Sequence, residues 1–277
     1  MKRAKINFDS AITSSEFDDI YFSKDDAIAE STYIFLDNNH LPKRFKESRK
    51  NFSIAELGFG SGLNFLLTAD LWHKRPLLKL AHVEQVQGAH GAENRSVHEV
   101  REDLSTGATQ QLPLGVEFRK RSKEEWLNYY AIEGYPMSTP DLARTLSHFS
   151  DNLNKEAINY LLSAWDNLKA GINTITFPKL KIKLTLIIGD ISEFFTHLPN
   201  NSIQAWYLDG FAPSKNPAMW EDYIYLNMLS KSSKEATFST FTSAAKVRRG
   251  LINAGFAVEK VKGYGRKREM LRGQLAS

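Results

Sequence analysis

Three closely spaced glycines and a preceding acid form the segment whose residue types point most directly to chemistry. Residues 55–65 read AELGFGSGLNF, with Gly58, Gly60 and Gly62 following Glu56. Glycine allows the backbone to turn sharply, and a ligand can then lie against main-chain N–H groups that no side chain shields. The segment therefore predicts a loop that holds a nucleotide or an adenosyl cofactor, with a merely structural tight turn as the alternative.

The spacing of these glycines separates two kinds of cofactor loop. The third glycine comes one position earlier than in the dinucleotide pattern G-x-G-x-x-G, and no Lys-Ser/Thr pair of a P-loop follows. The pattern E-x-G-x-G-x-G instead resembles motif I of class I methyltransferases, which bind S-adenosylmethionine. This resemblance implies that Glu56, Gly58, Gly60 and Gly62 belong to the cofactor site.

A cofactor that contains a ribose needs a carboxylate near the end of the next strand, because one acid can hold two hydroxyls. Two acids compete for this role. Glu84 lies 22 residues after Gly62, whereas Glu133 lies 71 residues after it. The expected distance is about 20 residues, so spacing alone favours Glu84.

Asp209 directly follows an apolar run in residues 205–213, AWYLDGFAP. Doubly wound folds bind ligands at the carboxyl ends of their strands, where this acid should lie. The Gly-Phe-Ala-Pro that follows is similar to the turn of amino-group methyltransferases that grips the target nitrogen. We therefore predict that Asp209 orients an amine and accepts its proton, and that Phe211 stacks on the substrate base. A structural turn and a core aromatic are the alternatives.

Asp190 ends another apolar run, LTLIIGD. Such an acid can accept a hydrogen bond from the amino group of a bound adenine. It can equally cap a helix over residues 191–198. The sequence leaves both interpretations open.

The elements that must position these residues alternate between strands and helices. Short apolar or β-branched runs, typical of a parallel sheet buried on both faces, occur at residues 52–57, 128–132, 184–188, 203–208 and 237–241. The runs 256–261 and 269–275 predict a closing antiparallel hairpin. We expect an α/β fold with a doubly wound, mostly parallel, seven-stranded sheet of the class I methyltransferase type.

Three signals mark the predicted helices. Residues 63–72 should form a helix directly after the glycine loop. Asn216 and Pro217 suit the N-cap and first position of another helix, and residues 243–254 form a third that ends at Gly255.

The composition fits a folded chain without disulfides. With 277 residues, 42% of them hydrophobic, the chain can bury a substantial core, and the absence of cysteine excludes a disulfide framework, a thiolate metal site and a cysteine nucleophile. Residues 1–30 contain neither a signal h-region nor a membrane span, and no later run reaches 18 apolar residues. We expect a cytoplasmic protein with an extension at residues 1–50, a catalytic domain at 51–277 and an insertion at about 74–125.

Positive charge is concentrated near the C-terminal end of a chain whose net charge is +4. This charge either forms a solvated face or contacts nucleic-acid phosphates. The basic residues are Lys246, Arg248, Arg249, Lys260, Lys262, Arg266, Lys267, Arg268 and Arg272.

Six ordered blocks of the sequence resemble the methyltransferase domain of the MnmC family, bifunctional enzymes that modify the wobble uridine of tRNA. Among them are AELGFGSGLNFL, IEGYPMSTPDLA, WYLDGFAPSKNPAMW and KGYGRKREML. The resemblance implies methyl transfer from S-adenosylmethionine to the aminomethyl nitrogen of 5-aminomethyl-2-thiouridine, with tRNA as partner. It also favours Glu133 over Glu84. Family members commonly continue into an FAD oxidase, and we expect this chain to carry only the methyl-transfer half.

Three other functions stay open at this point. A methyltransferase for a protein or small-molecule amine would share both motifs. A nicotinamide oxidoreductase would share the fold but not the glycine spacing. A non-catalytic RNA-binding module would keep the basic surface without a cofactor.

Overall fold

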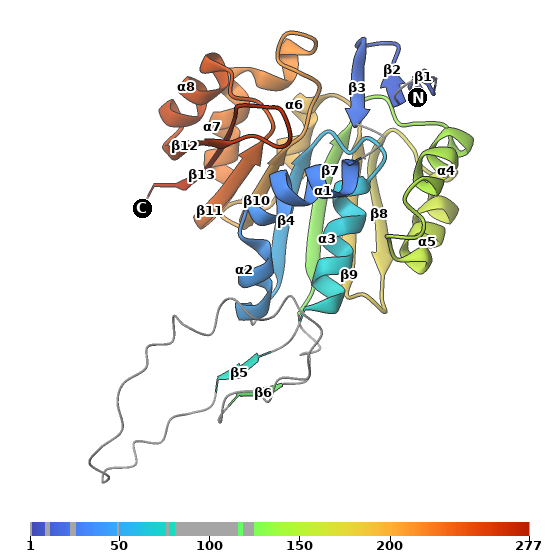
Figure 1. Cartoon of the computed structure of the whole chain (residues 1–277), viewed down its shortest axis with the longest axis horizontal. Helices are drawn as coiled ribbons and strands as arrows, with labels where there is room; N and C mark the ends of the chain where they lie inside the picture. Colours follow the sequence, from blue (N-terminus) through green and yellow to red (C-terminus); the bar gives the residue numbers. More distant parts are fainter. Residues whose placement is uncertain are drawn as a thin grey trace. The chain divides into compact units, whose positions relative to one another are not determined.

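An eight-stranded sheet forms the centre of the molecule (Figure 1). The computed structural model describes residues 2–8, 12–22, 26–48, 50–75, 78–80, 116–118 and 125–276. The strand order is β12-β13-β11-β10-β4-β7-β9-β8. The strands are β4 (Phe52–Leu57), β7 (Leu127–Glu133), β8 (Gly171–Phe177), β9 (Ile182–Ile188), β10 (Ile203–Leu208), β11 (Ser232–Thr240), β12 (Phe256–Lys262) and β13 (Glu269–Leu275).

Five adjacent strands of the sheet, from β11 to β9, are parallel, as their apolar runs predict. β4 pairs with β7 and β10, β9 extends the sheet beyond β7, and β11 extends it beyond β10. All six residues of β4 are buried, which explains why this strand reads as a continuous run and shows no alternation. The predicted doubly wound, mostly parallel sheet is confirmed.

Both edges of the sheet are antiparallel. β12 and β13 form the predicted closing hairpin, and β13 pairs with β11. At the other edge β8 pairs antiparallel with β9, so the described sheet has eight strands where the sequence predicted seven. β8 reads GINTITF, and four of its first five positions are polar, exposed or half-buried. It therefore lacks the apolar run that identified the other strands.

Helices cover both faces of the sheet and complete two hydrophobic cores. One core lies against α2 (Leu41–Glu47), α3 (Leu63–Lys74), α4 (Thr139–Ser147) and α5 (Lys155–Trp165). The other core lies against α6 (Ile191–Phe194), α7 (Asp222–Lys231) and α8 (Ala245–Asn253). The fully buried Trp72 and Trp165 belong to the first core, and Trp206 belongs to the second.

Helix starts agree with the sequence in two of three places. α3 begins directly after Gly62, and α8 occupies the predicted 243–254 region. Asn216 and Pro217 open only a one-turn 3-10 helix, η3 (Pro217–Trp220), and the Asn216 side chain makes no cap hydrogen bond. The chain becomes extended at Glu221, so the long helix α7 starts five residues later than expected.

The N-terminal region adds a small sheet and two short helices. β1 (Ile6–Asn7), β2 (Ile12–Ser14) and β3 (Asp19–Phe22) form an antiparallel meander. α1 (Ala27–Ser31) continues into the π-helical turn η1 (Thr32–Asp37), whose residues Ile34 and Phe35 join the first core. A 3-10 turn, η2 (Phe195–His197), follows α6.

Residues 76–121 form a second compact unit, separate from residues 1–75 and 122–277. Its described part is the antiparallel pair β5 (Leu78–Leu80) and β6 (Val116–Phe118). Most of the predicted insertion at 74–125, including Glu84, lies outside the described residues. Among the described helices, none combines the length and apolar character that a membrane crossing requires.

Candidate active site

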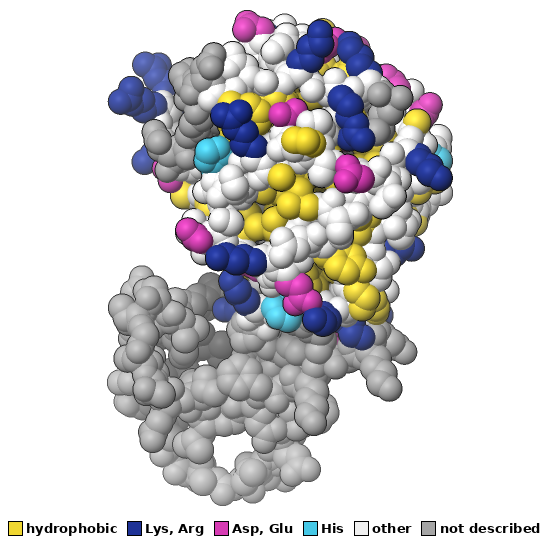
Figure 2. Space-filling model, turned by 90° about the vertical axis from the view of Figure 1, so that its right-hand side faces the viewer, with side chains coloured by type: hydrophobic (Ala, Val, Ile, Leu, Met, Phe, Trp, Pro, Cys, Tyr) yellow, Lys and Arg dark blue, Asp and Glu magenta, His cyan; other side chains and the backbone are white. Residues whose placement is uncertain are grey.

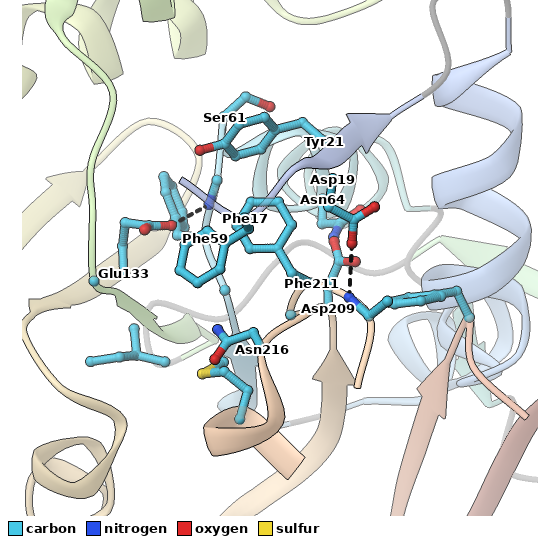
Figure 3. A pocket seen from close by; sticks show the side chains of 18 of the residues that line it. Phe17, Asp19, Tyr21, Phe59, Ser61, Asn64, Glu133, Asp209, Phe211 and Asn216 are labelled. Carbon is cyan, nitrogen blue, oxygen red and sulfur yellow. Dashed lines mark hydrogen bonds between the residues drawn. The ribbon is translucent and has the colours of Figure 1, made fainter. Parts of the chain in front are cut away.

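A cavity of about 680 Å³ opens at the carboxyl ends of β4, β7, β9 and β10 (Figure 3). This is the edge at which doubly wound sheets bind ligands. The volume falls within the range of about 300 to 1,000 Å³ that is common for small-molecule sites. The loops after these strands build the wall, together with residues of the N-terminal meander, α1, η1 and the β12–β13 turn.

The glycine loop uses a backbone conformation that other residues rarely adopt. Gly58, Gly60 and Gly62 have φ angles of +95°, +55° and +73°. At Gly58 a Cβ atom would lie 2.4 Å from the carbonyl oxygen of Asp209, so only glycine lets these two loops meet. Residues 58–61 line the cavity, but the N–H groups of Gly58 and Phe59 donate to the Ile132 carbonyl and that of Gly60 donates to Glu133. The predicted contact between a ligand and these N–H groups therefore stays a prediction.

Glu133 is the last residue of β7, and its carboxylate faces the glycine loop (Figure 3). Its Oε2 accepts a hydrogen bond from the Gly60 N–H, and its Oε1 accepts one from the Tyr135 N–H, both at 2.8 Å. Burial raises the pKa of Glu133, and these backbone hydrogen bonds oppose the shift. The structure therefore brings Glu133 and the glycine loop together in one wall of the cavity.

Glu56 does not line the cavity, although the sequence predicted it among the cofactor-binding residues. Side chains of a strand point alternately to the two faces of the sheet, and Glu56 lies within β4, one residue before its end. The side chain is fully buried against α3, where it accepts hydrogen bonds from Tyr129 Oη and Asn64 Nδ2, both at 2.9 Å. Burial raises the pKa of Glu56 well above its ordinary value. Glu56 thus stands behind the cavity wall, which its side chain does not line.

Asp209 lies in the wall directly after β10, as predicted. Its Oδ2 accepts a hydrogen bond of 2.6 Å from Asn64 Nδ2, and its main-chain N–H donates to the Leu57 carbonyl. Burial raises the pKa of Asp209 from 3.8 to about 7, while the bond from Asn64 lowers it and the charge of Glu30 raises it. A carboxyl group with this pKa can exchange a proton near neutral pH.

Phe211 lines the cavity, and another aromatic ring covers one face of its ring (Figure 3). Its ring stacks on Phe17 at 4.5 Å with an interplanar angle of 27°, and Tyr21 meets it edge-on at 5.3 Å. Phe17 and Tyr21 come from the N-terminal meander. The aromatic group at the site is therefore a cluster of three rings and not the single ring that the sequence indicated.

Asp190 both caps a helix and lines the cavity. Its Oδ1 accepts a hydrogen bond of 2.9 Å from the Ser192 N–H at the start of α6. This interaction lowers the pKa of Asp190. The capping interpretation is correct, and the position of Asp190 in the cavity wall is compatible with the adenine interpretation.

Comparison with known proteins shows what this chain is similar to. Residues 152–276 match the family model of an S-adenosyl-L-methionine-dependent methyltransferase. All of the chain aligns at 35% identity with the tRNA 5-methylaminomethyl-2-thiouridine biosynthesis bifunctional protein MnmC of Aeromonas hydrophila, covering 36% of that protein. The MnmC protein of Pseudoalteromonas atlantica is 36% identical, again over all of this chain and 34% of its own length. The chain is related to the MnmC proteins.

A solved structure agrees with this relationship at the level of the fold. The crystal structure of MNMC2 from Aquifex aeolicus matches with a TM-score of 0.63 and 18% identity, over all of this chain and 72% of that one. The chain spans about a third of the length of the MnmC relatives named above. The predicted resemblance to the MnmC methyltransferase domain is confirmed, and residues 152–276 match an S-adenosyl-L-methionine-dependent methyltransferase family.

Sequence reasoning missed several residues that line the site. Asn64 directly follows the glycine loop in GSGLN, but its link to Asp209 is visible only in the fold. Asp19 accepts a hydrogen bond from the Ala212 N–H at 2.9 Å and so ties β3 to the loop after β10. Further lining residues that were not predicted include Phe17, Tyr21, Glu30 and Asn216.

The predicted basic surface divides into cations with different surroundings. Lys267 lines the cavity, where its Nζ lies 3.1 Å from Glu30 Oε1. Arg266, its neighbour in the β12–β13 turn, is exposed. Figure 2 shows the right-hand side of the molecule in Figure 1, away from α8, β12 and β13, and on that side lysines and arginines are scattered among acidic and apolar side chains. Three other basic residues of the surface pair with acids: Lys246 with Glu221, Lys260 with Glu269 and Arg272 with Glu259.

Proposed function

We propose that this chain methylates the aminomethyl nitrogen of 5-aminomethyl-2-thiouridine at the wobble position of tRNA, with S-adenosylmethionine as methyl donor. The observation that carries the proposal is that Asp209, whose pKa is about 7, lines the same cavity as the glycine loop. The names of the MnmC relatives support it, because 5-methylaminomethyl-2-thiouridine is the N-methylated form of this substrate. We place the reaction in the cytoplasm, where such a tRNA is found.

The cofactor fits the half of the cavity around the glycine loop. Residues 58–61 line this half of the cavity, and Glu133 offers a carboxylate beside them. We assign the ribose hydroxyls to Glu133 and the adenine amino group to Asp190. When bound, S-adenosylmethionine supplies a methyl group activated by its sulfonium.

Asp209 handles the amine of the substrate. A primary ammonium ion has no lone pair, so the amine must lose a proton before it can attack a methyl group. A carboxylate whose conjugate acid has a pKa near the working pH is a suitable proton acceptor, and such groups contribute about 10²- to 10⁴-fold to rates. We assign to Asp209 both the orientation of the nitrogen and the acceptance of its proton.

The remaining wall would receive the nucleotide. Glu30, Phe241 and Lys267 line it, and the ring cluster of Phe17, Tyr21 and Phe211 lies beside Asp209. RNA-modifying enzymes bind an extruded base by stacking and by contacts to its edge. We propose that Phe211 takes part in this stacking and that Phe17 holds its ring in place.

The test is mass spectrometry of nucleosides from tRNA that carries 5-aminomethyl-2-thiouridine, after incubation with the protein and S-adenosylmethionine. We expect 5-methylaminomethyl-2-thiouridine to appear only when both are present. A parallel incubation with free small amines and with peptide lysines distinguishes other amine substrates. The proposal is refuted if calorimetry shows cofactor binding while the tRNA nucleoside stays unmethylated.

A further inference from the structure

Two buried carboxyl groups meet at one amide in the wall of the cavity. The Nδ2 of Asn64 donates to Asp209 Oδ2 at 2.6 Å and to Glu56 Oε1 at 2.9 Å. Tyr129 donates to the other oxygen of Glu56. A continuous set of hydrogen bonds therefore runs from β7 through β4 and α3 to the carboxyl group at the end of β10.

We propose that Asn64 is a positioning residue, which holds the Asp209 carboxyl group in one orientation by anchoring it to Glu56. This inference rests on the proposed function of Asp209. It assigns to Glu56 a structural task in the reaction site in place of contact with the cofactor.

The orientation of the Asn64 amide supports this role. Its nitrogen offers two N–H donors, and both are used by carboxyl oxygens. Its Oδ1 is buried and has no hydrogen-bond partner among the described residues. If the amide were turned over, Oδ1 would face both carboxyl groups and neither would receive a hydrogen bond from Asn64. The observed orientation leaves Oδ1 without a partner but provides a donor to each acid.

Burial makes the anchor rigid. Asn64 is 4% exposed, and Glu56 and Tyr129 are fully buried. Thr68 Oγ1 donates a hydrogen bond of 2.7 Å to the main-chain carbonyl of Asn64 and so stabilises the first turn of α3. Because these residues cannot move without opening the core, the bond to Oδ2 fixes the rotation of the Asp209 carboxyl group.

The same arrangement decides which acid carries a charge. Two like charges that share one neutral donor in a buried site cannot both form at low cost. Burial raises the pKa of Glu56, and the charge of Asp209 raises it further, while no cation of the described residues lowers it. Asp209 also faces Lys267 of the β12–β13 turn, whose charge lowers its pKa, and Glu30 of α1, whose charge raises it. The arrangement therefore disfavours the charged form of Glu56, and Asp209 is the member whose charged form has a cation nearby.

The first test measures single-turnover methyl transfer and cofactor affinity in Asn64→Ala. We expect transfer to slow by about 10-fold or more, because a hydrogen bond to a charged group is lost, while the dissociation constant of S-adenosylmethionine changes by less than about 3-fold. The matched control is Asn154→Ala. Asn154 caps α5 through the Ala157 N–H, so its loss should lower the melting temperature and leave transfer intact.

The second test asks whether Glu56 is the anchor. Glu56→Ala should slow transfer as Asn64→Ala does, and Glu56→Gln, which keeps an acceptor for Asn64, should recover most of the loss. If either Glu56 variant weakened S-adenosylmethionine binding more than it slowed transfer, Glu56 would be a cofactor ligand and the inference would be overturned.

The third test needs no substrate and so separates this inference from the proposed function. Carbon-13 NMR of the Asp209 carboxyl group reports its titration in the free protein. In Asn64→Ala the midpoint should rise, because the bond that lowers the pKa is gone. An unchanged midpoint together with an unchanged transfer rate overturns the inference. A raised midpoint in a protein that methylates no tRNA refutes the proposed function alone.

Discussion

The main-chain N–H of Gly60 donates a hydrogen bond to Glu133 Oε2 across 2.8 Å, although the two residues are 73 positions apart. This bond joins the glycine loop after β4 to the carboxyl end of β7. It orients one carboxylate oxygen of Glu133 before any ligand arrives. This part of the cavity wall is thus held in place by backbone groups of the chain itself.

Glu133→Ala should weaken S-adenosylmethionine binding by about 1 to 3 kcal/mol, the cost of leaving charged hydrogen bonds unmade. Calorimetric titration measures this directly. Glu84→Ala is the matched control and should change the affinity little, although spacing alone favours that residue. The reverse order of effects would restore Glu84 as the ribose ligand.

Asp209→Ala should remove most methyl transfer and leave the affinity for S-adenosylmethionine within about a few-fold of wild type, because its proposed contact is with the amine and not the cofactor. A single-turnover assay with saturating cofactor measures the chemical step. Wild-type turnover in this variant would reduce Asp209 to a structural turn.

The raised pKa of Asp209 also predicts how stability depends on pH. The pKa of Asp209 is about 7 in the folded protein and 3.8 ordinarily. The group therefore contributes its full stabilisation of the fold below about pH 4, and this contribution is lost as the pH rises through about 7. Asp209→Asn keeps an acceptor for Asn64 and cannot ionise. Thermal melts should show this variant gaining stability over wild type by about 1 kcal/mol or more between about pH 5 and pH 8, since one pKa unit corresponds to 1.36 kcal/mol. A difference that stays constant with pH would contradict the assignment.

The sequence predicted those site residues whose position follows from the strand itself. Asp209 stands where a buried apolar run stops, and the carboxyl ends of parallel strands meet at one edge. Glu133 also ends such a run, but spacing favoured Glu84, and only the resemblance to the MnmC family favoured Glu133. Glu56 shows the limit of this reasoning. It is one residue inside β4, and the alternation of the strand turns its side chain into the core.

The residues that were missed come to the site through tertiary packing. Phe17 stacks on Phe211, 194 positions away, and nothing in the local pattern of the meander indicates that contact. β8 was missed for a different reason. As an edge strand it is buried only towards its end, so its sequence mixes polar and apolar residues.

Gly58→Ala should destabilise the protein and lower methyl transfer, because the new Cβ would lie 2.4 Å from the Asp209 carbonyl oxygen and push the two loops apart. Gly171→Ala provides a matched control: its φ is +85°, close to the +95° of Gly58, but a Cβ there meets no atom within 4 Å. Backbone strain should cost about 1 kcal/mol in both variants, and the collision should add to it only at Gly58. Equal melting temperatures and equal activities in the two variants would show that the close approach has no role.

The β12–β13 turn allows phosphate contact and cavity chemistry to be tested separately. Arg266 is exposed and does not line the cavity, whereas Lys267 lines the cavity beside Glu30. Phosphate contacts position a nucleic acid without reading its sequence, and each lost contact flattens the log–log salt dependence of binding by about one unit. Arg266→Ala should therefore weaken tRNA binding at all sequences, flatten the salt dependence and leave methylation of the free nucleoside unchanged.

Lys267→Ala should in addition slow methylation of the free nucleoside, which has no phosphates. Lys267 lowers the pKa of Asp209, so without it less of the Asp209 carboxyl group is ionised at neutral pH. Binding titrations at several salt concentrations and single-turnover assays on the nucleoside distinguish the two variants. If tRNA affinity and its salt dependence survive both substitutions, this turn belongs to a solvated face and the RNA must dock elsewhere. If only the nucleoside reaction suffers in Lys267→Ala, the turn serves the chemistry of the cavity and not the backbone of the tRNA.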